Sequence, residues 1–220
     1  PNAMPPARLS VRPAVWPVST DGLVFAWASG DTENLVPDPA TGEAVRCTVR
    51  PRGAARLTRH HTMDTAGGAF LAEDADERLL ARLTETNRLS LEVTIVPERL
   101  DQSGPARIVT FSANASSRNY TLGQQGAELV MRLRTPRTGS NGTKPSVTFG
   151  TLRPGRPHHV VVTYEPGRMR CYLDGKRVAE TDDVRGDFAN WEPQTFLFGD
   201  EANGGRNWDG VIEGVAVYDR

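Results

Sequence analysis

The chain has 220 residues, with 26 lysines and arginines against 27 aspartates and glutamates, and its formal net charge is −1 at pH 7. This balance argues against the concentrated basic face of a nucleic-acid-binding domain, and no apolar run approaches the ~18 residues that a membrane-spanning helix needs. A chain of this length buries enough apolar surface to fold without a disulfide or a metal, and it suits one large β-sandwich.

The first 18 residues are rich in proline, which is typical of an extended arm or linker. Within them, Asn2-Ala3-Met4 reads like a remnant of an expression vector. We therefore expect an arm over residues 1–18 and a single domain over residues 19–220. No secretory signal is visible, which in a trimmed chain says nothing about the parent protein. The first strand is expected over Leu23–Trp27.

One helix is expected. Residues 74–77, Asp-Ala-Asp-Glu, resemble a capping box, in which Asp74 accepts from an early helical amide and Glu77 reaches back. Leu79, Leu80 and Leu83 then form a short apolar stripe at helical spacing. We expect this stripe to pack against a sheet edge and the helix to end near Asn87.

Most of the remaining chain alternates strands with turns. In residues 89–95, apolar residues alternate with serine, glutamate and threonine, as expected when one face of a strand is wet. Further strands are expected over residues 45–49, 108–113, 119–123, 129–134, 146–150, 195–199 and 211–218, whereas residues 31–42 and 135–145 read as loops and residues 50–65 show no clear pattern. This spacing predicts an all-β fold, an antiparallel β-sandwich or jelly roll with one short helix.

Residues 155–179, GRPHHVVVTYEPGRMRCYLDGKRVA, predict three strands joined by two tight turns. The turn at residues 165–168 has proline and glycine where a type II turn needs them, and Asp174-Gly175 suits a type I′ hairpin. Between these turns Met169, Cys171 and Leu173 alternate with Arg168, Arg170 and Tyr172. The segment is therefore an antiparallel meander with one apolar and one polar face.

This meander resembles a signature of laminin-G-like domains in the concanavalin A-like lectin/glucanase superfamily. The resemblance extends over roughly residues 89–220, where Phe196–Gly199 and Trp208–Tyr218 resemble two further strands of the family. Pro157 stands where the family usually has tryptophan, and Glu213 stands where it usually has aspartate. The resemblance implies a concanavalin A-like sandwich whose first strand pairs beside its last.

A narrower resemblance, carried by residues 118–124, 132–136 and 138–142, points to a bacterial branch found within larger membrane-attached or exported proteins. It implies an extracellular or periplasmic recognition module that binds a carbohydrate or a partner protein. The chain stops directly after its last expected strand, which suggests a domain cut from a longer protein or one at its end. The alternative is an architectural spacer whose loops bind nothing.

Catalysis is not expected. Glycosidases need two carboxylates about 5–10 Å apart, and the glucanase relatives carry a Glu-x-Asp-x-x-Glu type strand. Here Glu92 is followed by Thr94 and Val96, and Glu213 is followed by Val215. A divergent glycoside hydrolase or lyase is the less favoured alternative.

Calcium is the one cofactor for which the sequence offers candidate ligands. The loop at residues 199–210 has the oxygen donors with which lectin-like sandwiches hold Ca²⁺, and its candidate ligands are Asp200, Glu201 and Asp209. The ordered spacing of an EF-hand is absent. A hairpin connection rich in turn residues is the alternative.

Carbohydrate binding needs an aromatic platform with fixed polar groups beside it. Trp191 and Trp208 lie in polar loop surroundings and are candidates, with Asn203, Arg206 and Asn207 nearby. The alternative for each tryptophan is a core anchor or a loop staple.

Three arginines are candidates for a shallow surface that binds an anionic ligand. Arg132 and Arg134 lie on the polar face of their strand, and Arg118 precedes a neighbouring strand. A solvated face is the alternative.

The cysteines and histidines show no catalytic or chelating pattern. Cys47 and Cys171 allow one disulfide or two free thiols; the apolar face on which Cys171 lies favours buried thiols, whereas a disulfide would suit an exported protein. His158 and His159 are adjacent on a strand and face opposite sides, so they cannot chelate one metal together.

Overall fold

The computed structural model describes residues 16–220 apart from residues 32, 39–40 and 103. One sheet contains β1 (Leu23–Ala28), β5 (Arg56–Leu57), β6 (Met63–Asp64), β8 (Leu89–Pro97), β13 (His158–Glu165), β14 (Arg168–Leu173), β15 (Lys176–Thr181) and β17 (Gly210–Tyr218). The other contains β4 (Thr48–Gly53), β7 (Gly68–Glu73), β9 (Ala106–Asn114), β10 (Ser117–Gln125), β11 (Glu128–Leu133), β12 (Val147–Thr151) and β16 (Thr195–Phe198). The expected vector remnant at residues 2–4 lies outside the described residues.

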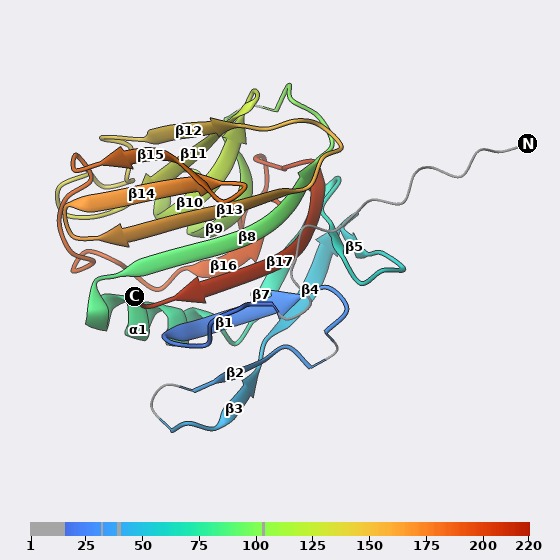
Figure 1. The fold of residues 1–220 in the computed structure, drawn as a ribbon, viewed down its shortest axis with the longest axis horizontal. Coiled ribbons are helices and arrows are strands. Elements are labelled where there is room, and N and C mark those ends of the chain that lie inside the picture. The colour runs from blue at the N-terminus through green and yellow to red at the C-terminus, as the bar shows by residue number, and fades with distance from the viewer. Residues whose placement is uncertain (1–15, 32, 39–40, 103) are drawn as a thin grey trace, which may run out of the picture.

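The two sheets pack face to face as an antiparallel sandwich (Figure 1). The front sheet, nearer the viewer in Figure 1, has the order β15-β14-β13-β8-β17-β6-β5, with β1 also paired to β17. The back sheet has the order β12-β11-β10-β9-β16-β7-β4, and a small third sheet pairs β2 (Leu35–Pro37) with β3 (Ala44–Arg46). The predicted all-β sandwich with a short helix is confirmed.

The core lies between the inner faces of the two sheets. In β8 the residues Leu89, Leu91, Val93 and Ile95 are fully buried, as the alternation predicts. Aromatic rings fill the space opposite them: the ring centroids of Phe25 and Phe196 lie 5.1 Å apart, in an edge-on arrangement. Burial of such side chains is the main force that holds the sheets together.

The predicted meander is present as β13, β14 and β15, and its turn chemistry is confirmed. Gly167 has φ 84°, while Asp174 and Gly175 have φ 52° and 77°. These positive values are the ones that the two turn types require. The expected pairing of the first strand beside the last is also confirmed, since Trp27 of β1 lies opposite Val215 of β17.

The helix α1 (Asp76–Thr86) ends where it was expected to end but begins differently. Asn87 closes it in the left-handed conformation, and Leu79 and Leu83 are buried. The predicted capping box is wrong: the cap position is Ala75, which makes no side-chain cap. Asp74 has φ 53°, and Asp76 Oδ1 accepts from the backbone N–H of Phe196 at 2.8 Å. Asp76 therefore ties the helix to β16 instead of capping it.

The segment between the first strand and the helix holds more strand than the sequence indicates. The expected loop at residues 31–42 contains β2, and residues 50–65 contribute to β4, β5 and β6. Pairing between distant residues creates these strands, as where Pro51 of β4 lies opposite Phe70 of β7. No helix in the described part of the chain is long and apolar enough to cross a membrane.

Candidate functional site

The outer face of the front sheet carries a groove whose floor is set by strand register. Tyr218 of β17 lies opposite Ser90 of β8, and Ser90 lies opposite Thr163 of β13. Thr163 in turn lies opposite Arg170 of β14. Because paired residues share a face, these side chains form one row across four strands.

A second row lies two residues along the same strands. It contains Glu92, Val161 and Tyr172, which are opposite one another in β8, β13 and β14. The complete lining comprises Val18, Ser19, Arg88, Ser90, Glu92, Val161, Thr163, Tyr164, Glu165, Arg168, Arg170, Tyr172, Tyr218 and Arg220. The groove encloses about 480 Å³, which is within the usual size range of sites for small ligands.

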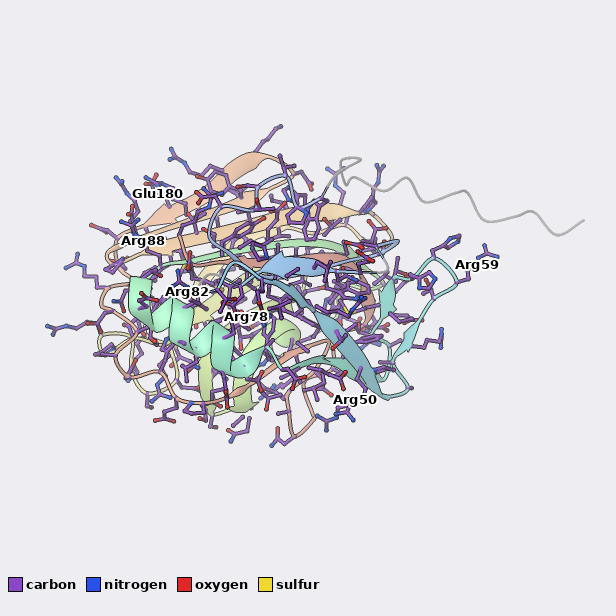
Figure 2. The ribbon with its side chains drawn as sticks, turned by 90° about the horizontal axis from the view of Figure 1, so that it is seen from below. Arg50, Arg59, Arg78, Arg82, Arg88 and Glu180 are labelled. Atoms are coloured by element: carbon purple, nitrogen blue, oxygen red, sulfur yellow. The ribbon has the colours of Figure 1, made fainter. Side chains whose placement is uncertain are left out.

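Four arginines give the groove its chemical character. Arg168 and Arg170 reach it from β14 and share the Glu180 carboxylate, at 3.3 Å and 3.1 Å. The Arg220 guanidinium lies over the Tyr218 ring, 5.6 Å from its centroid. Arg88, the fourth, is exposed and lies with Glu180 at one end of the molecule (Figure 2).

Glu92 occupies one side of the groove and is fully engaged. Its carboxylate accepts hydrogen bonds from the Trp16 indole at 2.9 Å, His159 Nε2 at 2.8 Å and the Tyr218 hydroxyl at 3.0 Å. Burial alone would raise the pKa of Glu92, but these donors outweigh burial and lower the pKa. Glu92 therefore stays ionised and organises the groove wall.

The structure reassigns both candidate tryptophans to the core. The Trp191 ring stacks on Phe188 with centroids 4.1 Å apart, and its indole donates to the Arg134 carbonyl at 2.7 Å. Trp208 is fully buried and donates to Gln124 Oε1 at 2.8 Å. A ring without an exposed face cannot stack on a sugar, so the expected aromatic platform is wrong and the core-anchor alternative holds.

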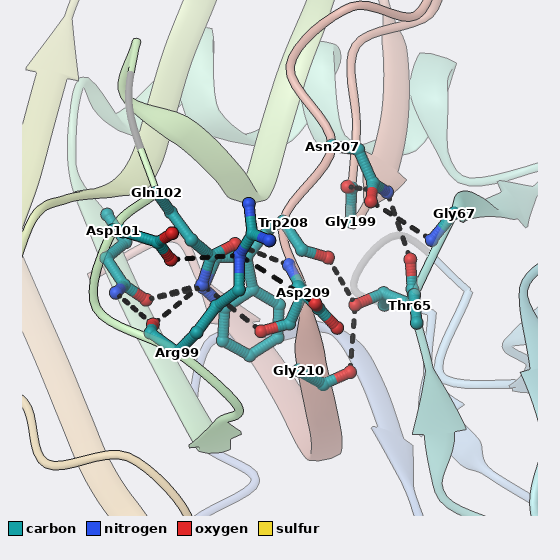
Figure 3. Close-up of polar contacts among 12 residues, drawn as sticks. Thr65, Gly67, Arg99, Asp101, Gln102, Gly199, Asn207, Trp208, Asp209 and Gly210 are labelled. Atoms are coloured by element: carbon teal, nitrogen blue, oxygen red, sulfur yellow. Dashed lines mark hydrogen bonds and ion pairs between the residues drawn. The ribbon is translucent and has the colours of Figure 1, made fainter.

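Asn207 fastens the loop instead of facing a ligand (Figure 3). Its Nδ2 donates to the carbonyls of Thr65, Gly68 and Gly199, and its Oδ1 accepts from the Gly67 N–H. These bonds use its whole amide. Asn207 therefore joins the turn before β7 to the end of β16.

The three candidate calcium ligands do not converge. Asp200 Oδ1 accepts from the backbone N–H groups of Glu201 and Arg206, and Asp209 lies 3.9 Å from Arg99 (Figure 3 shows the surroundings of Asp209). Glu201 is buried against Arg107. Among the described residues, no group of three or more histidine, cysteine, aspartate or glutamate side chains is placed to hold a metal ion.

The other candidate ligand-binding residues do not form one site. Arg134 pairs with Glu192 at 2.8 Å, and Asn203 is exposed in its loop. Arg118, Arg132 and Arg206 lie close enough together on the outer face of the back sheet to perturb one another electrostatically. Arg118 is fully buried, so the expected shallow surface is wrong for this residue.

The two cysteines are free thiols, and His158 and His159 each pair with a carboxylate. Cys47 and Cys171 are free and buried, so the structure contains no disulfide between them. His158 is buried and bonded to Asp174 at 2.9 Å, whereas His159 faces outward to Glu92, as expected of neighbours on a strand.

One sequence pattern predicted part of the groove lining. Arg168, Arg170 and Tyr172 alternate with the apolar face of β14, and the structure places all three in the groove lining. Tyr218 and Arg220 had no such signal, because only the pairing of β17 with β8 brings this end of the chain to the same groove as β13 and β14.

The fold is that of a lectin-like β-sandwich domain. A laminin-G family model, described as the concanavalin A-like lectin/glucanases superfamily, matches residues 67–220, and the chain belongs to this family. No curated protein matches the chain in sequence.

Solved structures share the fold at low sequence identity. The binding domain of botulinum neurotoxin DC in complex with rat synaptotagmin II is 13% identical, with a TM-score of 0.64, over 91% of this chain and 49% of that one. A second structure is of botulinum neurotoxin type C, a toxin whose cell entry depends on interaction with two ganglioside molecules. It is 13% identical, with a TM-score of 0.63, over 91% of this chain and 48% of that one. Trypanosoma rangeli sialidase with the inhibitor DANA is 14% identical, with a TM-score of 0.63, over 92% and 31%. The chain thus spans about half of the toxin chains and about a third of the sialidase.

Proposed function

We propose that this chain is a non-catalytic recognition module and that its groove binds an acidic glycan. The observation that carries the proposal is that four arginines and three tyrosines line one groove of about 480 Å³. Guanidinium groups recognise carboxylate and sulfate groups through paired hydrogen bonds. The half-buried Tyr172 ring offers a stacking surface, and the hydroxyls of Ser90 and Thr163 suit sugar hydroxyls.

The solved relatives support this kind of partner. One binds a protein and another depends on gangliosides, so the fold serves both partner classes in those proteins. A non-catalytic role is supported by Glu92, whose three donors leave it committed to the groove wall. We extend the proposal, on the sequence resemblance alone, to a bacterial exported or membrane-attached parent protein.

A glycan array tests the proposal. The chain is screened against neutral, sialylated, uronate-bearing and sulfated glycans, once with calcium and once with a chelator. We expect binding of acidic glycans alone, and a chelator-sensitive signal would add calcium to the proposal. Tyr172→Ala and Arg170→Gln should each weaken binding by at least about tenfold, equivalent to about 1.4 kcal/mol.

Arg50→Gln is the matched control, because Arg50 lies on β4, well away from the groove, and is paired only with Glu73 among the ion pairs of the described residues (Figure 2). Equal binding of neutral glycans, or full binding by the groove variants, would contradict the proposal. A chain that binds no glycan but captures a defined protein through the groove would be a protein-recognition module, and one that binds neither would be an architectural spacer.

A further inference from the structure

The outer face of the back sheet is covered by polar side chains that are cut off from solvent. Thr110 and Ser112 of β9 and Thr121 of β10 are fully buried, on the face opposite the core residues Phe111 and Tyr120. The Thr110 hydroxyl lies 2.6 Å from that of Thr121 and 2.9 Å from that of Ser112. These hydroxyls form the centre of what we call the arginine layer.

Register places arginines around this centre. Arg132 of β11 lies opposite Thr121, and Arg118 lies opposite Ser112. Arg107 lies opposite Gly123, where no side chain intervenes. Arg206 adds a fourth guanidinium from the loop after β16, and its carbonyl accepts from the Arg107 N–H at 2.8 Å. The arginine layer is thus Arg107, Arg118, Arg132, Arg206, Thr110, Ser112, Thr121 and Glu201.

Only one arginine of the layer has a carboxylate partner among the described residues. Glu201 accepts from Arg107 Nε at 2.5 Å and from the Ser112 hydroxyl at 2.6 Å. Arg132 donates to the Ser146 hydroxyl at 3.2 Å, while Arg118 donates to the carbonyls of Ala115 and Asn141. The layer therefore has more buried positive than negative charge, and such an excess is costly in a low-dielectric site.

Arg118 shows most clearly that the layer lacks negative charge and hydrogen-bond acceptors. It is fully buried, and its Nε has no hydrogen-bond partner. Burial, together with the neighbouring charges of Arg107 and Arg132, lowers the pKa of Arg118 to about 10. A buried guanidinium with a free N–H is a donor that lacks an acceptor.

We propose that the arginine layer binds an oxyanion, the carboxylate or sulfate group of an acidic ligand, between Arg118, Arg132 and Arg206. Glu201 is the internal precedent, since its carboxylate already sits on Arg107 and Ser112 in the same layer. Arg132 and Arg206 are only half-buried, so the anion enters on their side. Gly104 has φ 120° and lies against the Arg206 guanidinium, where a Cβ would collide with it. This site lies on the sheet opposite the groove and does not depend on the proposed function.

Titration of the wild-type chain tests the site, with sodium sulfate, sodium glucuronate and, at matched ionic strength, sodium chloride. Nitrogen-proton NMR follows the arginine Nε–H signals, and thermal unfolding follows stability. We expect a saturable shift of the Arg118 signal with sulfate, glucuronate or both, and an increase of at least about 2 °C in the unfolding temperature on saturation. The salt that binds more tightly identifies the ligand group as sulfate or carboxylate.

Variants separate this site from the groove. Arg132→Gln, at a half-buried position, should weaken the saturable binding by at least about tenfold. Arg118→Lys has no Nε–H group, so the signal that is missing from its spectrum is that of Arg118. Arg137→Gln, an exposed arginine outside the layer, and Tyr172→Ala in the groove should leave the affinity unchanged. A non-saturable response equal to that of chloride, or equal binding by Arg132→Gln, would overturn the proposal and leave a buried water as the partner of Arg118.

Discussion

The Trp16 indole donates to Glu92 across the front sheet, at 2.9 Å, and so fixes the start of the described chain to the outer face of β8. Its ring lies over Gly214 of β17, where an added Cβ would come within 2.8 Å of the ring. Val18 and Ser19, which follow, form one border of the groove. Glu92 therefore links the N-terminal segment, the sheet and the groove.

Glu92→Gln should destabilise the chain at neutral pH and much less in acid. Because the folded-state pKa of Glu92 lies below its ordinary value of 4.5, the ionised carboxylate stabilises the fold above that pH. This stability is lost as the pH falls through the lowered pKa. Loss of hydrogen bonds to a charged group costs on the order of 1.5–3 kcal/mol.

Urea unfolding at pH 7 and at successively lower pH measures this effect. The free energies of unfolding of wild type and Glu92→Gln should start to converge below the ordinary glutamate pKa and meet most closely below the lowered pKa of Glu92. Glu128→Gln, at an exposed position, is the control and should change little. A constant difference between wild type and Glu92→Gln at every pH would contradict the assignment.

Trp208→Ala should lower stability instead of removing a ligand contact. The ring is fully buried, and Gly210 leaves the space in which it packs. Removing a buried tryptophan costs about 3–5 kcal/mol, or about 6–20 °C in the unfolding temperature for a chain of this size. Circular dichroism on heating measures the shift, and Trp208→Phe should show a smaller one. An unchanged unfolding temperature would mean that the ring is not a core anchor.

The meander could be predicted from the sequence because its information is local. Asp174-Gly175 sets a turn by its own backbone preference, and alternation in β14 needs only neighbouring residues. The short strands before α1 could not be predicted in this way. Their pairing depends on residues about 20 positions away, such as Pro51 and Phe70, and register between distant strands leaves no local signal.

The candidate site was harder to predict for the same reason. Trp208 is followed by aspartate and glycine, which resembles an exposed loop, yet Gln124 from a distant strand receives its N–H in the core. Arg132 and Arg206 were recognised as candidates, but Arg107 was not, because its position in the same layer follows from the β9–β10 register. Sequence patterns identified the residue types, and tertiary pairing decided which of them meet.

Both thiols should be unreactive in the folded chain. Burial raises the pKa of Cys171 to about 12, and burial also raises the pKa of Cys47 despite the opposing effect of Ala26 and Arg78. Since the thiolate is the reactive form, an aromatic disulfide reagent at mildly alkaline pH should react slowly. Denaturation without reductant should release both cysteines of the chain for reaction. A count of zero after denaturation would show a disulfide and contradict the structure.

Removing one member of the Arg107–Glu201 pair should lower the free energy of unfolding strongly, whereas replacing both members by apolar residues should lower it little. Both side chains are almost completely buried, at 1% and 0% exposure, and Nε lies 2.5 Å from Oε1. Glu201→Met leaves Arg107 charged and unpaired in the arginine layer, so a loss of about 3–5 kcal/mol is expected. Arg107→Met leaves Glu201 unpaired and should cost a similar amount.

The double variant Arg107→Met with Glu201→Met removes both charges at once. Since replacing a buried pair by apolar residues is often nearly neutral, its loss should be well below the sum of the two single losses. Urea unfolding of the four proteins gives the coupling free energy directly. Arg82→Met with Asp219→Ala, at a pair in which Arg82 is 27% exposed, provides the comparison and should show weaker coupling. Additive losses at Arg107 and Glu201 would mean that the two charges do not depend on each other, and the assignment of Glu201 as the internal anion of the layer would then be wrong.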